Sequence, residues 1–380
     1  MRALQFFFCT IGALLLWTIP SKAQENQGPQ SYNPVVTGAP ILSITPDARS
    51  AAMGEIGLTT SADAFALFHN TSKLAQIEKT WGVAFGYTPW MAQRVKDISL
   101  SSLTGYYHWG NLGYINHAVG ASVRYFHIGE AKAFQQNLFT PITIVPYEVA
   151  VDLGYAIALN SHWSLGVNMK YLRSDYNFSV EQTKGQVNRL LGDLSATYQT
   201  TFRLSDEADA AFRSAIVLNN IGAPMSYDGG ATYLYAPTTL RLGVGMEVHL
   251  QQEHQIGLHL ETNKVLAPTL TDHDRKNREL YNALGMWKAI AQSFGDAPGG
   301  ASEEFKEVIW AVGAEYSYDN RLFLRSGYHY QHKSKGTNSG FSIGAGLVYN
   351  HINVDIAYFL ATQSNSPLNN TFRLTLGVNF

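Results

Sequence analysis

The last ten residues, Thr371 to Phe380, constrain the fold of this chain more than any other stretch. Apolar residues hold every even position from Phe372 to Phe380, and polar residues or glycine hold every odd position. Successive side chains of a β-strand point to opposite faces, so this strand has one apolar and one polar face. It would separate an apolar medium from an aqueous one. A soluble sandwich could use such a strand, but it would rarely end on the final aromatic residue.

The same alternation recurs from Trp81 to the C-terminus. Repeated segments of about ten residues with apolar and polar faces are typical of transmembrane β-barrels. The sequence therefore predicts an all-β fold, a transmembrane antiparallel β-barrel of about 14 strands spanning residues 79–380. The expected strands are 81–87, 98–109, 113–127, 143–159, 162–176, 189–202, 211–219, 237–250, 254–264, 306–318, 321–332, 339–350, 351–361 and 371–380.

The links between these segments alternate in length. Tight turns at 160–161, 251–253, 319–320 and 350–351 alternate with longer links at 128–142, 177–188, 220–236, 265–305 and 362–370. Outer-membrane barrels have short periplasmic turns and long extracellular loops. We therefore expect an integral outer-membrane protein with its short turns and both termini in the periplasm.

The N-terminus predicts a secretory signal peptide over residues 1–23. Arg2 precedes the apolar run from Leu4 to Ile19, and Ser21-Lys22-Ala23 fits a small-x-small cleavage site. A transmembrane anchor is the alternative, although the run is short for one. Cys9, the only cysteine, lies inside this segment. A mature chain without cysteine has no disulfide, thiolate zinc site or thiol nucleophile.

Residues 24–78 differ in composition from the strands that follow, and we expect a loose lead-in and then a plug in the barrel lumen. The run from Pro46 to Gly54 has small residues and a helix start, and Ser61 to Asn70 is a second short helical candidate. A small N-terminal cap on a soluble domain is the alternative interpretation.

The lumen-facing positions of the predicted strands carry charges of both signs. A strongly selective pore would carry mainly one sign, so we expect these groups to pair across strands or to contact the plug. The predicted lumen-facing set is Arg124, Asp152, Lys170, Asp193, Arg241, Glu247, His249, His259, Glu261, Glu315, Arg325, His329, Asp355 and Arg373.

Nothing in the sequence supports a catalytic, cofactor or metal site, and the formal net charge of −2 does not suggest a nucleic-acid partner. Ser342 lies in a G-x-S-x-G pattern, but within a strand rather than at the strand-to-helix elbow that hydrolases need. His329 and His332 would point to opposite faces of a strand. Asp272, His273 and Asp274 are interpreted as a surface patch.

The insertion 265–305 is the longest link and carries an apolar stripe at helical spacing. A loop of this length in a compact domain is usually functional or disordered. The stripe either docks on the barrel mouth or presents an anchor to a partner. Its candidate partner-binding residues are Leu280, Leu284, Trp287, Ile290 and Phe294.

Two stretches resemble the PorV (LptO) family of outer-membrane components of the type IX secretion system of Bacteroidetes. They are Ser43 to Gly57, which contains Pro46-Asp47-Ala48-Arg49 and Gly54, and Ala64 to Ala75, which contains Asn70. Trp81 to Met91 strengthens the resemblance. The chain also resembles bacterial outer-membrane barrels in ending on an aromatic residue. This resemblance implies that Phe380 is part of the signal that the barrel-assembly machinery reads.

The resemblance implies a shuttle. Such a protein would bind the C-terminal signal domain of secreted cargo, take the cargo from the SprA translocon and carry it to the attachment complex with the PorU sortase. The wider family is similar to the fatty-acid transporter FadL, whose plug often carries Asn-Pro-Ala where this chain has Asn70-Thr71-Ser72. A FadL-like importer of hydrophobic molecules is therefore the alternative function, and an outer-membrane lipid deacylase is a third hypothesis.

Overall fold

The structure is a computed structural model of the full chain, in which residues 32–91, 97–110, 115–133, 142–176, 185–250, 253–269, 281–363 and 366–380 are described. The chain divides into two units, Met1–Tyr32 and Asn33–Phe380. The predicted signal peptide, Leu280 and the patch Asp272 to Asp274 lie outside the described residues. None of the helices in the described part of the chain is long and apolar enough to cross a membrane.

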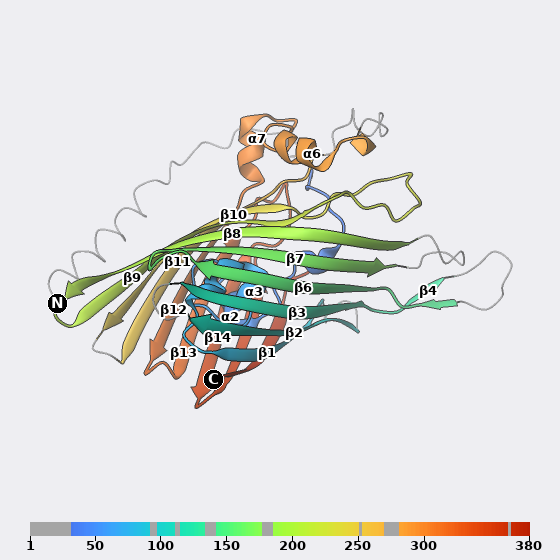
Figure 1. Cartoon of the computed structure of the whole chain (residues 1–380). Coiled ribbons are helices and arrows are strands. Elements are labelled where there is room, and N and C mark those ends of the chain that lie inside the picture. The colour runs from blue at the N-terminus through green and yellow to red at the C-terminus, as the bar shows by residue number, and fades with distance from the viewer. Residues whose placement is uncertain are drawn as a thin grey trace. The chain divides into compact units, whose positions relative to one another are not determined.

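The second unit is a closed antiparallel barrel of fourteen strands, as predicted, in which each strand pairs with its neighbour along the chain and β1 closes on β16 (Figure 1). The barrel strands are β1 (Trp81–Pro89), β2 (Ile98–Gly110), β3 (Asn116–Ile128), β6 (Tyr147–Ala158), β7 (Trp163–Asp175), β8 (Gln186–Ser205), β9 (Ala208–Gly222), β10 (Thr239–Leu250), β11 (His254–Val265), β12 (Ile309–Tyr318), β13 (Leu322–Tyr330), β14 (Gly340–Tyr349), β15 (Ile352–Ala361) and β16 (Thr371–Asn379).

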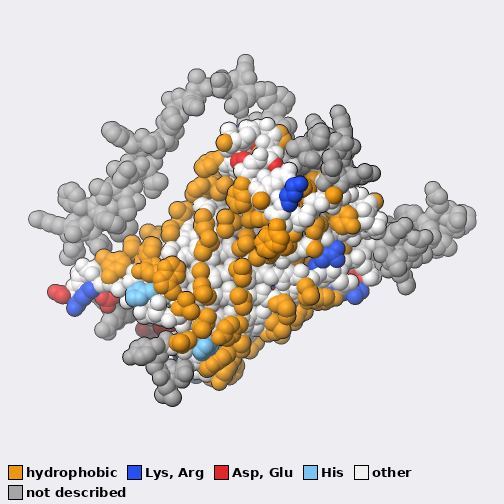
Figure 2. Space-filling view, turned by 45° about the horizontal axis from the view of Figure 1, so that its top comes forward, with side chains coloured by type: hydrophobic (Ala, Val, Ile, Leu, Met, Phe, Trp, Pro, Cys, Tyr) orange, Lys and Arg blue, Asp and Glu red, His pale blue; other side chains and the backbone are white. Residues whose placement is uncertain are grey.

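Side chains alternate between lumen and exterior as the sequence predicts. On β16, Phe372 and Leu376 are exposed, whereas Arg373 is 1% exposed inside the barrel. Figure 2 shows rows of apolar side chains along the strands of the outer surface. Apolar groups face outward and charged groups inward, which is the inverse of a soluble protein and suits a wall bathed in lipid.

The connections confirm two different rims. The short-turn rim has connections such as 206–207 and 350–351, and the long-loop rim has connections such as 223–238 and 266–308. The barrel closes at the short-turn rim, where the Trp81 amide donates to the Phe380 carbonyl at 3.2 Å and the Phe380 amide donates to the Trp81 carbonyl at 2.9 Å. The rings of Trp81 and Phe380 stack with centroids 4.5 Å apart.

Residues 33–77 form the plug, which carries η1 (Pro40–Leu42), α2 (Ala48–Ala52), α3 (Ala66–His69) and η2 (Thr71–Gln76). The plug begins at the long-loop rim, where the Asn33 amide donates to the Ser334 carbonyl at 2.9 Å. It then passes through the lumen and reaches β1 at the short-turn rim. The two ends of the barrel wall, Trp81 and Phe380, lie together at the short-turn rim, as expected, whereas the N-terminus of the chain lies outside the described residues.

Three further differences concern the strand ends. Residues 203–210, expected as a link, are mostly strand, because β8 and β9 extend to a tight turn at 206–207. The expected link 128–142 contains β4 (Ala131–Ala133), which pairs with β5 (Ile142–Ile144). The strand expected from residue 306 begins at Ile309, and it follows a helix, α7 (Ala301–Lys306), that the sequence did not predict.

Candidate functional site: a bonded plug beneath a loop cap

The start of the plug is fixed by Asp47, which caps α2. One carboxylate oxygen of Asp47 accepts from the Ser50 amide at 2.7 Å, and the other lies 2.7 Å from Nε2 of His69. An aspartate before the first helical turn satisfies an amide that has no partner in the helix. The Ala48 amide donates to Oγ1 of Thr375 on β16 at 2.9 Å. The motif that begins at Pro46 therefore joins the two short helices of the plug to the barrel wall.

Arg49 carries a polar network between plug and wall. Its guanidinium donates to both carboxylate oxygens of Glu315 on β12, at 3.0 and 2.8 Å, and to Asp63 within the plug at 3.2 Å. Glu315 also accepts from Arg325, which reaches Asp355 at 2.6 Å. The charges alternate in sign along this chain of contacts, so each buried ion has a partner of opposite sign.

Gly54 lies where the plug touches β13 and β14. Its φ of +74° is in the left-handed region, and a Cβ there would lie 3.0 Å from the backbone of Tyr328. Only glycine fits such a position without strain. The Ser342 hydroxyl accepts from the Gly54 amide at 2.7 Å and donates to the Ala52 carbonyl at 2.8 Å. The serine of the G-x-S-x-G pattern therefore holds the plug backbone.

Asn70 also joins the plug to the barrel wall, at β8 on the side of the lumen opposite β13 and β14. Its Nδ2 donates to the Leu58 carbonyl at 3.0 Å and to Oγ1 of Thr197 on β8 at 2.8 Å. Ser72, two residues on, hydrogen-bonds Asn70 and Thr197. The predicted plug motif thus contacts β8, β12, β14 and β16. The predicted lumen charges pair across strands or contact the plug, as expected, except His249, which is exposed.

A cavity of about 480 Å³ lies between the plug and the long loops. Its walls combine apolar side chains from plug and loops with charged side chains from the strands. The lining includes Leu42, Ile44, Phe68, Trp90, Arg241 and Arg373. The cavity is thus a closed-bottomed chamber, because the bonded plug forms its floor.

The insertion between β11 and β12 forms a cap at the long-loop rim, built from α6 (Met286–Gln292) and α7. Figure 1 shows both helices above the ends of β10 and β8. Lys264 donates to Glu304 and Glu307, at 2.7 Å each. Lys335 donates to Glu303 at 2.5 Å and to Glu307 at 3.0 Å. These ion pairs hold α7 to the barrel.

The predicted stripe of the insertion divides between two environments. Leu284 and Ile290 are half-buried, and Leu284 packs against a cluster of Tyr235, Tyr281 and Ala289. Trp287 is 65% exposed and Phe294 is 53% exposed. One side of the insertion thus docks on the loops, as one alternative predicts, and the other side is exposed; partner binding by this stripe stays a prediction.

The sequence analysis missed two features of the cap. Phe305 on α7 is 66% exposed and adds a third outward aromatic side chain. The carboxylates at 303, 304 and 307 recur at the spacing of one helical face, which could have predicted the helix.

The family model of "Type IX secretion system protein PorV" matches residues 26–272, well over half of the chain. No curated protein is significantly similar in sequence. Among solved structures, the CymD monoaromatic hydrocarbon channel is 13% identical with a TM-score of 0.45, and the match covers 88% of this chain and 97% of that one.

Two other solved structures are similar at the same level. The Ralstonia pickettii toluene transporter TbuX is 11% identical with a TM-score of 0.43, over 92% of this chain and 99% of that one. A Pseudomonas aeruginosa FadL homologue is 11% identical with a TM-score of 0.44, over 88% and 99%. These values say nothing about what this chain binds. The family match does identify it: the chain belongs to the PorV family and is an integral outer-membrane component of the type IX secretion system.

Proposed function

We propose that this protein is an outer-membrane adaptor without enzymatic activity, and that its long-loop rim binds the C-terminal signal domain of secreted cargo. The cargo is received from the SprA translocon and carried to the attachment complex, where the PorU sortase acts. The PorV family supports the secretion role, and the identity of these partners is what the resemblance of the stretches Ser43 to Gly57 and Ala64 to Ala75 implies.

One observation carries the proposal: the plug is hydrogen-bonded to the barrel wall while the cap exposes aromatic side chains. Removing the plug would break contacts of Arg49, Gly54 and Asn70 with three parts of the wall. Breaking one buried ion pair alone costs about 3–5 kcal/mol. A path through the barrel is therefore costly to open, whereas the outer surface of the cap is free to bind.

The cap has the side chains that protein interfaces use most. Trp287, Phe294 and Phe305 are each more than half exposed, and aromatic residues dominate the energetics of many interfaces. With the long loops outside the cell, as is usual for outer-membrane barrels, these residues would face cargo that has crossed the membrane.

The double substitution Trp287→Ser and Phe294→Ser tests this proposal. Losing one aromatic anchor costs about 2 kcal/mol or more, which is more than tenfold in affinity. We expect cargo to accumulate in the periplasm and its amount in the medium to fall at least tenfold. Lys288→Ser and Ala291→Ser, at exposed positions of the same helix, are the matched controls. Normal secretion by the double variant, with a barrel that still migrates as a folded species, would exclude these residues as the contact.

A FadL-like transporter of hydrophobic molecules is the second candidate, because the chamber above the plug has apolar walls of Leu42, Ile44 and Phe68. Uptake of a radiolabelled long-chain fatty acid by cells with and without the protein separates the two functions. An adaptor predicts equal uptake by both strains. A loss of uptake with normal secretion would favour the transporter.

A further inference from the structure

The hairpin of β8 and β9 projects past its neighbour at the short-turn rim. Pairing of β7 with β8 ends at Trp163 opposite Tyr198, whereas β8 continues to pair with β9 as far as Ser205. The last contact on the β7 side is the Gln199 amide, which donates to the His162 carbonyl at 2.8 Å. Among the described residues, no strand pairs with 200–205 on that side. Figure 1 shows β8 and β9 extending beyond the start of β7.

The open edge presents a defined set of backbone groups. Alternate residues of a strand direct their N–H and C=O groups to opposite neighbours. Because the Gln199 amide faces β7, those of Thr201 and Arg203 face the same, open side. The Arg203 side chain turns away toward the hairpin turn, where it donates to the carbonyls of Ser205 and Asp206. Unprotected edges of this kind are templates for a further strand.

Side chains at the edge specify what kind of strand would fit. Phe202 and Leu204 are 43% and 48% exposed on the outward face, while Thr201 and Arg203 lie on the other face. Side chains directly opposite one another in a sheet interact. A strand that alternates apolar and polar residues would therefore continue both faces.

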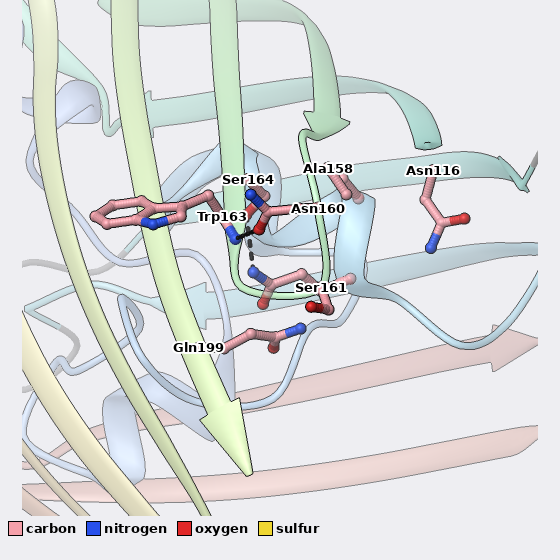
Figure 3. Close-up of a pocket in the computed structure, with 9 residues that line it drawn as sticks. Asn116, Ala158, Asn160, Ser161, Trp163, Ser164 and Gln199 are labelled. Carbon is pink, nitrogen blue, oxygen red and sulfur yellow. Dashed lines mark hydrogen bonds between the residues drawn. The ribbon is translucent and has the colours of Figure 1, made fainter. Parts of the chain in front are cut away.

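A pocket of about 240 Å³, lined by both apolar and polar side chains, lies at the inner end of this edge. Figure 3 shows Gln199 of β8 beside the turn that carries Asn160 and Ser161, with Ser164 behind them. Asn160 holds this turn in place, because its side-chain oxygen accepts from the amides of His162 and Trp163 at 2.8 Å. The pocket offers amide and hydroxyl groups to side chains of a strand laid along β8.

The charge of the hairpin tip distinguishes between possible occupants. Asp206, Glu207 and Asp209 are exposed, and Arg203 lies 3.4 Å from Asp206. The tip is therefore net acidic. Two such tips would repel each other, which disfavours a second copy of this chain, whereas a basic segment would be attracted.

We propose that the free edge of β8 at Thr201 and Arg203 binds, by β-strand addition, an extended basic segment of another protein that alternates apolar and polar residues. The site lies at the rim opposite the cap, so it does not depend on the proposed cargo contact. With short turns in the periplasm, the partner would be a periplasmic protein or domain.

Proline substitutions at the edge test this proposal in cells that produce the full chain. Thr201→Pro with Arg203→Pro removes both free N–H groups, and proline is tolerated on a strand edge that faces solvent. Thr201→Ala with Arg203→Ala loses the same side chains but keeps the amides, and is the matched control. A photo-crosslinking residue, p-benzoyl-phenylalanine, replaces Leu204 in each background. The same residue at Asp209, on the paired side of the tip, reports non-specific contacts.

With the crosslinking residue at position 204, we expect one discrete adduct with another polypeptide. It should form both in the otherwise wild-type protein and in the alanine pair. That adduct should be at least tenfold weaker in the proline pair and absent from position 209. Absence of any adduct, or equal adduct in the proline pair, would overturn strand addition, and an adduct of two copies of this chain would overturn the stated occupant. Heat-modifiable gel migration checks folding; if the proline pair fails this check, the single Thr201→Pro variant replaces it.

Discussion

Arg49 shows how a single residue fixes the plug to the barrel wall. Its guanidinium binds Glu315, which lies 266 positions away in sequence, and it binds Ser61 and Asp63 within the plug. Buried charges are stable only when they are paired and hydrogen-bonded. The same network that satisfies the lumen charges therefore fixes the plug.

Arg49→Leu should loosen the plug while the barrel remains intact. The substitution leaves Asp63 without its arginine and removes one of the two arginine partners of Glu315. Losing one partner of a buried pair costs about 3–5 kcal/mol. We expect frequent open-channel events in planar lipid bilayers where the wild type shows almost none. Arg203→Ser, at an exposed arginine of the hairpin tip, is the control, and a wild-type trace for Arg49→Leu would contradict the role of this network.

Asp296 gives the cap a dependence on pH. Burial, together with the charges of Glu304 and Glu307, raises the pKa of Asp296 to about 6. A carboxyl whose pKa is higher in the folded state binds more protons there, so its contribution to stability falls as pH rises from about 4 to about 6. Lys335 and the Gly299 amide help hold the pKa of Glu303 below its usual value despite burial, and this carboxyl therefore acts in the opposite direction.

Asp296→Asn isolates this effect, because the amide oxygen can still accept from the Thr269 amide. We expect proteolytic cleavage of the cap to be slower in the variant than in the wild type at pH 7.5, and the difference to shrink at pH 4.5. Comparing the two proteins at each pH cancels the contribution of Glu303. A difference that does not change with pH would refute the assignment.

At the scale of elements, the cap helix α6 lies between a packed side and an exposed side. Leu284, just before the helix, packs into the loop cluster, whereas Trp287 faces outward. Leu284→Asp should therefore open the cap, and Trp287→Ser should leave it closed. Limited proteolysis of detergent-solubilised protein measures this directly, with at least a tenfold faster cleavage expected for Leu284→Asp alone. Equal rates for the two variants would show that α6 does not divide in this way.

Sequence alternation predicted the strands and the parity of their side chains, because residues such as Phe372 and Arg373 must face lipid and lumen in turn. Alternation carries no information about stagger between strands, so the projection of β8 beyond Trp163 was not foreseen. Alternation also could not reveal that Arg49 pairs with Glu315, because a lumen with charges of both signs offers each charged side chain many possible partners. The apolar stripe predicted α6, but not which of its side chains would be covered.

At the scale of the whole molecule, the plug makes the two ends of the described unit lie at opposite rims. Asn33 lies beside Ser334 at the long-loop rim, and Phe380 lies beside Trp81 at the short-turn rim. The chain from Asn33 therefore passes through the barrel before it builds the wall. This path is consistent with a barrel that closes around its plug during assembly.

Cysteine labelling of intact cells tests this path and the orientation together. Cys9, the only cysteine of the sequence, lies in the predicted signal peptide, so Asn33→Cys and Asp206→Cys should each give a mature chain with a single thiol. A membrane-impermeant maleimide should label Asn33→Cys on whole cells and label Asp206→Cys only after the outer membrane is permeabilised. The reverse pattern would invert the orientation, and labelling of both on intact cells would contradict a plug that spans the lumen.

The central claim is that this barrel is an adaptor that holds secreted proteins at its cap. The most direct measurement is affinity purification of the tagged protein from detergent-solubilised outer membrane, with mass spectrometry of the proteins and lipids that co-purify. The claim predicts secreted proteins that share a C-terminal β-domain, together with the translocon or the sortase, and their loss from the Trp287→Ser and Phe294→Ser variant. A lone barrel with bound fatty acid would contradict it and favour transport.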